Sequence, residues 1–147
     1  MNILIDDITA SPKELSYREE VDELNVRLGQ GGRDYQVPNG LAVEVTYYRA
    51  GLDVFFQGVL RGEVLANCAR CLEEYRFGLD KPFSFVLVPR AAVGEDSGEQ
   101  SPDDMAFSFY RGKEIDLTPL VHEQAILALP TRPLCGEGCR GLCARCG

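Results

Sequence analysis

The alternation of apolar and polar residues between positions 41 and 88 constrains the fold of this chain more than any other feature. A first segment gives one face to Leu41, Val43, Val45 and Tyr47. A longer second segment gives one face to Leu52, Val54, Phe56, Gly58, Leu60, Gly62 and Val64. A period of two is the signature of a β-strand. The length of the second segment predicts a bent or barrel-forming strand that curls at its glycines.

The alternation continues beyond a turn at Cys68–Cys71. Apolar residues recur at Tyr75, Phe77 and Leu79, and again after a predicted break at 80–82. Residues 41–88 therefore indicate an antiparallel meander. We expect a fold of the α+β class that is mainly β, an antiparallel meander or partly closed barrel with one or two helices and a Cys-rich C-terminal tail.

The flanking regions supply the remaining elements. Residues 2–8 predict a short edge strand, and Ser11-Pro12 predicts a turn or a helix start. Residues 17–28 fit a helix, which we favour, or a late strand. Thr118 as cap and Pro119 in the first turn predict a second helix that Pro130 ends. His122 is expected on the polar side of this helix.

Composition divides the chain into two parts. An apolar content of 45% is ordinary for a globular protein. We assign residues 1–130 to a mainly-β domain that includes an acidic, aperiodic loop at 90–104, and residues 131–147 to a Cys-rich tail that we expect to bind zinc. The net charge is −8. The tail is the one locally basic segment, with Arg132, Arg140 and Arg145 against Glu137.

These totals narrow the classes of function. An acidic chain is poorly suited to sequence-independent nucleic-acid binding, which depends on neutralising phosphates. Arg140 and Arg145 remain candidate contacts for RNA or a partner. No apolar run is long enough to cross a bilayer, and the N-terminus lacks the features of a signal peptide. We therefore expect a cytoplasmic protein whose thiols stay reduced.

Catalytic constellations are not evident. His122 is the single histidine, and next to Glu123 it fits a solvated surface position. Residues 29–32 are glycine-rich but lack the Lys-Ser/Thr of a phosphate-binding loop. The acidic residues at 95–104 have no apolar wall that would shift their pKa values. The sequence therefore predicts a protein that is not an enzyme and has no small-molecule substrate.

The six cysteines carry the clearest chemistry: Cys68, Cys71, Cys135, Cys139, Cys143 and Cys146. One interpretation closes a metal site within the tail, from Cys135 to Cys146, and leaves the first pair free. A second interpretation joins Cys68 and Cys71 to Cys143 and Cys146, as in a zinc ribbon. A third assigns thiol–disulfide exchange to a Cys-x-x-Cys pair, although Cys68 follows a strand pattern and not the helix N-terminus that such chemistry prefers.

Metal binding would have a structural purpose. Leu142 is the one large apolar residue between the tail cysteines, so burial alone cannot offset the entropy of ordering this segment. We expect one zinc ion, which would hold Arg140 and Arg145 on a rigid tip.

Several of these segments together resemble the YceD-like family of large ribosomal RNA subunit accumulation proteins. They are Cys68-Ala-Arg-Cys71-Leu72-Glu73, the run Glu114-Ile115-Asp116-Leu117 before a helix that ends in Leu129-Pro130, and Cys139-Arg-Gly-Leu-Cys143 followed by Cys146-Gly147. The resemblance spans about residues 40–147. It implies a cytoplasmic, mainly β, noncatalytic accessory factor for 23S rRNA synthesis, processing or accumulation in bacteria. It brings no catalytic residues.

The acidic surface favours action through a ribosome-assembly protein or a precursor large-subunit particle, with only weak direct contact to rRNA. Two other functions stay open at the level of sequence. One is a thiol–disulfide redox protein or sensor that uses the Cys-x-x-Cys pairs. The other is a zinc-stapled protein-interaction module unrelated to ribosomes.

Overall fold

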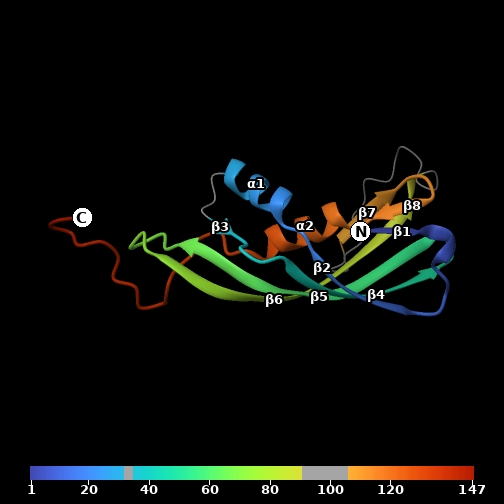
Figure 1. The fold of residues 1–147 in the computed structure, drawn as a ribbon, viewed down its shortest axis with the longest axis horizontal. Coiled ribbons are helices and arrows are strands. Elements are labelled where there is room, and N and C mark those ends of the chain that lie inside the picture. Colours follow the sequence, from blue (N-terminus) through green and yellow to red (C-terminus); the bar gives the residue numbers. More distant parts are fainter. Residues whose placement is uncertain (32–34, 91–105) are drawn as a thin grey trace.

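A long, bent β-sheet forms the body of the protein, and both α-helices lie on one of its faces (Figure 1). The computed structural model describes residues 1–31, 35–90 and 106–147. The strands are β1 (Asn2–Leu4), β2 (Lys13–Glu19), β3 (Tyr35–Gln36), β4 (Leu41–Ala50), β5 (Asp53–Asn67), β6 (Glu74–Pro89), β7 (Ala106–Tyr110) and β8 (Glu114–Asp116). The helices are the 3-10 turn η1 (Ile5–Asp7), α1 (Asp22–Gln30) and α2 (Thr118–Ala128).

The main sheet has the strand order β2-β4-β5-β6-β7, and β3 pairs with β5 beyond the end of β4. Strands β4, β5 and β6 form the predicted antiparallel meander. Strand β7 then joins β6 in parallel, and β1 pairs with β8 in a separate two-stranded sheet. In the described residues the main sheet stays open, so the meander alternative is correct and the barrel alternative is not.

The predicted inward face of β5 is the centre of the hydrophobic core. Val54, Phe56, Leu60 and Val64 are completely buried. Phe56 stacks on Phe85 of β6 at 4.9 Å between ring centroids and on Tyr47 of β4 at 5.8 Å. Aromatic stacks of this kind add to the stabilisation that burial provides.

Gly58 allows the neighbouring strands to pack closely at the middle of β5. A Cβ atom at this position would lie 2.3 Å from the carbonyl oxygen of Glu44 and 2.6 Å from the ring of Phe83. Glu44 O belongs to the backbone of β4 and cannot move without disturbing the sheet. The sequence predicted that the long strand curls at its glycines, whereas the feature that requires glycine at position 58 is this close approach of β4 and Phe83.

The predicted break at 80–82 is wrong, because β6 runs through it without interruption. Asp80 lies opposite Arg61 of β5, and their charged groups are 3.5 Å apart. Among the described residues, β7 pairs with Phe85–Pro89 of β6 and not with Pro82. Within this part of the chain, no ladder hydrogen bond to β7 is therefore required from the Pro82 nitrogen.

The N-terminal third was predicted less accurately. The segment after Ser11-Pro12 is strand β2 and not a helix. The helix expected over 17–28 begins only at Asp22, because β2 continues to Glu19 in register with β4. The edge strand at 2–8 is limited to β1. The acidic loop predicted at 90–104 lies, from residue 91 onward, outside the described residues.

Helix α2 begins where the sequence indicated, but its cap differs. Thr118 is already helical, and its backbone N–H donates to Oδ1 of Asp116 at 3.0 Å. Val121 and Ala125 of this helix and Leu129 directly after it are buried. Among the described residues, no helix is both long enough and apolar enough to span a membrane.

Candidate functional site

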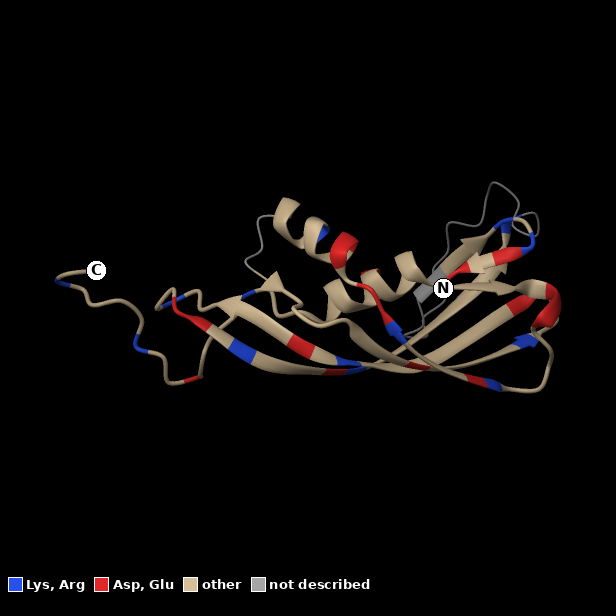
Figure 2. Cartoon of the chain, in the orientation of Figure 1, with Lys and Arg blue, Asp and Glu red and all other residues tan. Residues whose placement is uncertain are grey.

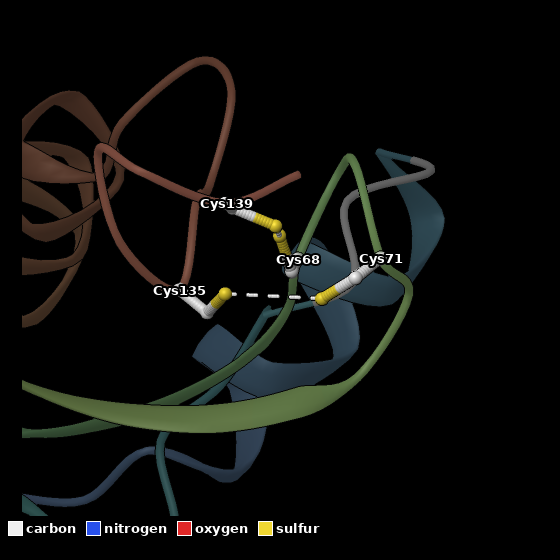
Figure 3. A group of neighbouring side chains, drawn as sticks. All are labelled: Cys68, Cys71, Cys135 and Cys139. Carbon is white, nitrogen blue, oxygen red and sulfur yellow. Dashed lines mark hydrogen bonds between the residues drawn. The ribbon is translucent and has the colours of Figure 1, made fainter. Parts of the chain in front are cut away.

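Four cysteine sulfurs converge where the β5–β6 hairpin meets the C-terminal tail (Figure 3). Cys68 and Cys71 come from the hairpin turn, and Cys135 and Cys139 come from the segment after α2. Sγ of Cys68 lies 3.7 Å from that of Cys139, and Sγ of Cys71 lies 3.8 Å from that of Cys135. All four sulfurs lie within 4.8 Å of one another. We call them the four-sulfur group.

The hairpin turn is shaped to direct two sulfurs to one side. Leu72 N–H donates to the carbonyl oxygen of Cys68 at 2.9 Å, and Arg70 N–H points to Sγ of Cys68 at 3.5 Å. Leu72 completes the turn with a φ of 63°, an uncommon conformation for a residue with a branched side chain. Cys68 N–H donates to Glu73 O at 2.9 Å and so continues the ladder beyond the strands.

Backbone contacts hold the tail against this turn. Ala69 N–H donates to Pro133 O at 2.8 Å, just before Cys135. The guanidinium group of Arg70 donates to Cys139 O at 3.1 Å. Gly141 has a φ of 77°, and a Cβ atom there would lie 3.4 Å from Arg70 O. Tyr35 OH donates to Pro130 O and fixes the point where the tail leaves the helix.

The four-sulfur group fits a tetrahedral metal ion. An ion with metal–sulfur bonds of about 2.3 Å separates its sulfurs by about 3.8 Å, which is the separation within both close pairs. A disulfide, in contrast, requires about 2.05 Å, and all six cysteines are free. A set of four thiolates is typical of zinc or iron. The group can therefore hold a metal ion.

The thiols of the four-sulfur group differ in pKa. Hydrogen bonds from the backbone amides of Cys71 and Cys135 lower the pKa of Cys68 to about 5. Hydrogen bonds with the neighbouring thiols of Cys139, Cys68 and Cys71 raise the pKa of Cys135 to about 12. Without metal, one thiolate is thus favoured while its neighbour keeps a proton. A metal ion that binds all four sulfurs must displace the remaining protons.

The pairing of cysteines differs from both metal interpretations of the sequence. The tail-only set would have excluded Cys68 and Cys71, and the ribbon set would have excluded Cys135 and Cys139. The structure joins the first pair to Cys135 and Cys139, and it leaves Cys143 and Cys146 outside the group. A signal for this pairing was present in the sequence. Only four residues separate Pro130 from Cys135, so the first tail cysteines are the ones that reach a turn close to the end of α2.

The two candidate contact residues of the tail are both exposed. Arg140 follows Cys139 directly, and Arg145 lies near the chain end. Figure 2 shows these basic positions along the segment that projects beyond the sheet. Sequence reasoning missed Arg70, which contacts Cys139 from the hairpin and adds a third arginine to the same end of the molecule.

A buried polar pair lies elsewhere in the protein, and sequence reasoning placed one member incorrectly. His122 is 1% exposed and not at the surface. Its Nε2 lies 3.2 Å from Glu20 O and 3.5 Å from Oε1 of Glu19, which is 5% exposed. Because a carbonyl oxygen can only accept, Nε2 carries a proton. The helical pattern misplaced His122 because Glu19, the last residue of β2, and the following Glu20 contact the side of α2 that was expected to face solvent.

Comparison with known proteins gives a family but no individual relative. The family model for the large ribosomal RNA subunit accumulation protein YceD matches residues 56–147. This range includes most of β5, all of β6, helix α2 and every cysteine. No curated protein and no solved structure matches the chain. Since the model covers more than half of the sequence, the chain belongs to the YceD family of large ribosomal RNA subunit accumulation proteins.

Proposed function

We propose that this protein is a noncatalytic accessory factor in the biogenesis of the large ribosomal subunit, needed for synthesis, processing or stability of 23S rRNA. The observation that carries the proposal is the family match, which spans the hairpin, the four-sulfur group and the tail together. The protein acts in the cytoplasm, and its partner is a ribosome-assembly protein or a precursor large-subunit particle.

The charge distribution favours a partner over free RNA. The chain has a net charge of −8, and strong binding to bare RNA requires many phosphate contacts from basic residues. Arg70, Arg140 and Arg145 lie at the hairpin–tail end and suit a small number of contacts to a phosphate or an acidic surface. The remaining acidic surface suits basic ribosomal or assembly proteins.

Zinc at the four-sulfur group has a structural role in this proposal. The thiolates of Cys68, Cys71, Cys135 and Cys139 would be its ligands. The bound ion supplies only a cross-link, since four protein ligands leave no open position for a substrate. The arginines next to the ligands would then be held at fixed positions. The sulfur separations and the backbone hydrogen bonds around Cys68 support this role.

Sedimentation tests the ribosomal role. In a strain that lacks the chromosomal copy, we expect the wild-type protein to sediment with precursor large subunits and to restore the ratio of 23S to 16S rRNA. An Arg140→Ala/Arg145→Ala variant should sediment less with these particles. An Arg49→Ala variant should sediment like the wild type, because Arg49 lies at the end of β4 that is farther from the cysteines. Absence of cosedimentation together with a normal rRNA ratio in the deletion strain would favour an interaction module unrelated to ribosomes.

Elemental analysis tests the metal. Protein purified under reducing conditions should contain zinc, and the ion of the four-sulfur group should be lost in both Cys71→Ser and Cys139→Ser. Loss in Cys139→Ser alone would place the site within the tail and contradict the four-sulfur group. Iron in place of zinc would correct the identity of the metal but not of its ligands.

The lowered pKa of Cys68 also fits a second candidate, a thiol–disulfide redox protein. Cys68 is, however, completely buried, and an attacking thiolate must reach its disulfide substrate. Alkylation with iodoacetamide near pH 7 separates the two candidates. Rapid modification of Cys68 in the zinc-loaded protein would favour redox chemistry, and protection of all four cysteines would favour the structural site.

A further inference from the structure

The two Cys-Ala-Arg-Cys segments of the chain have the same local structure. In the first, Arg70 N–H points to Sγ of Cys68, and the N–H of the next residue but one donates to Cys68 O. In the second, Arg145 N–H points to Sγ of Cys143 at 3.4 Å, and Gly147 N–H donates to Cys143 O at 2.9 Å. Both segments are therefore folded into the same sulfur-directing turn, although only the first belongs to the four-sulfur group.

The second turn has no ligands to complete it within the described part of the chain. Cys143 and Cys146 are exposed, and they lie outside the group formed by the other four cysteines. His122 is buried in the body. A tetrahedral ion needs four ligands, and this turn offers two. The turn is thus prepared as one half of a metal site.

We propose that Cys143 and Cys146 form a second zinc site together with the same two residues of a second copy of this chain. Two identical pairs supply four thiolates around one ion. The resulting contact is symmetric, with the metal on the two-fold axis, and it closes at two copies. The proposal does not depend on the ribosomal role, and it adds a site that is distinct from the four-sulfur group.

The distribution of charge favours a second copy of the tail as the source of the other two thiolate ligands. Four thiolates around Zn²⁺ carry a formal charge of about −2, and each tail brings Arg140 and Arg145 close to its cysteines. Residues 131–147 carry a net charge of +2, whereas the whole chain carries −8. The anionic metal centre thus lies between two basic segments, and it offsets the repulsion between them.

The shape of the protein allows this contact. The tail extends past the β5–β6 hairpin, and the C-terminus lies at the far end of the molecule from the β1–β8 sheet (Figure 1). Leu142, which is 49% exposed, precedes the turn directly and can be covered when two tails meet. Two copies joined at this point keep their acidic bodies on opposite sides of the ion.

Zinc content and molar mass, measured on the same zinc-saturated and reduced full-length protein, test the proposal. We expect a dimer with about 1.5 zinc ions per chain, one in each four-sulfur group and one shared between tails. Cys143→Ser/Cys146→Ser should be a monomer with about one ion per chain. Because these residues are exposed, the variant should fold normally. A strong chelator should return the wild type to a monomer under reducing conditions, which excludes a disulfide-linked dimer.

Two results would overturn the proposal. One is a wild-type protein that stays monomeric with saturating zinc, whether it binds one ion per chain or two. The other is a dimer that persists in Cys143→Ser/Cys146→Ser. The Cys71→Ser/Cys139→Ser variant is the matched control. If it dimerises with about half an ion per chain, the shared site exists independently of the four-sulfur group. If the four-sulfur group binds no zinc but the shared tail site exists, the wild-type protein should also be a dimer with about half a zinc ion per chain.

Discussion

The sheet body and the cysteine end of this protein are ordered by different means. The body buries a continuous apolar core, in which Phe56, Leu60 and Val64 are completely covered. The tail has few apolar side chains to bury, and it contacts the hairpin through backbone hydrogen bonds and through the thiols of the four-sulfur group. The body can therefore fold from its own side chains, whereas we expect the tail to become rigid only when a ligand binds. Predictions for each region separate these two kinds of stabilisation.

Truncation of the core should have the largest effect on stability. We expect Phe56→Ala to lower the free energy of unfolding by about 3–5 kcal/mol, because it removes a ring stacked between Tyr47 and Phe85. Urea denaturation followed by circular dichroism measures this loss. Phe55→Ala, one residue earlier and on the less buried face, is the matched control and should cost clearly less. Equal losses would mean that the two faces contribute alike.

The middle of β5 should tolerate no side chain at Gly58. An alanine Cβ would overlap with Glu44 O and the ring of Phe83, so Gly58→Ala should destabilise the body by about 1–3 kcal/mol through overpacking. Gly78→Ala in β6 is the control, because its Cβ would meet no atom within 4 Å. The two melting temperatures, measured by differential scanning calorimetry, should differ. A stable Gly58→Ala protein would show that β4 and β5 can separate locally.

The buried polar pair should contribute less than the apolar core but more than surface residues. Glu19→Ala removes the carboxylate next to His122 and should cost about 1–3 kcal/mol, because a buried polar group loses a partner. Glu20→Ala is the control, since its carboxylate is exposed and its backbone carbonyl, the group that contacts His122, is retained. Chemical denaturation compares the two variants. Identical values would indicate that water replaces the Glu19 carboxylate.

Removal of metal should have the smallest effect on the sheet and a clear effect on the tail. A chelator should leave a cooperative unfolding transition and the β-rich circular dichroism spectrum, because no core residue of the sheet depends on the ion. Cleavage by trypsin after Arg140 and Arg145 should accelerate about tenfold or more, as expected when local opening becomes easier by at least 1.4 kcal/mol. Mass spectrometry identifies the fragments. Collapse of the whole sheet would contradict the separation of the two regions.

The elements that were predicted well from the sequence are those in which one pattern of apolar and polar residues dominates. Residues 41–47 and 54–64 each alternate, and both strands and most of the predicted buried face agree with that pattern. Leu52, which was also expected on this face, lies in the turn before β5 and is 56% exposed. The predictions failed where tertiary contacts override local signals. Asp80–Pro82 contains turn-forming residues, yet it stays in β6, where Asp80 lies opposite Arg61 of β5 and Pro82 lies opposite Val59.

The candidate site shows the same limit. All members of the four-sulfur group were recognised as candidate ligands, but their pairing depends on how α2 positions the tail relative to the hairpin. His122 was misjudged because helical spacing cannot reveal that Glu19 and Glu20 contact that side of α2. Arg70 was missed because its contact with Cys139 joins residues far apart in sequence.

The length of β5 has a consequence for how partners sense the charge of this protein. Fifteen residues in extended conformation span about 50 Å, whereas the Debye length at physiological ionic strength is about 8 Å. The acidic residues around η1, next to the β4–β5 turn, are therefore screened from a molecule that approaches the cysteine end (Figure 2). There the arginines of the tail and hairpin act against only the few carboxylates close by. The net charge of the chain thus governs its solubility, while recognition at this end follows the local balance of charge.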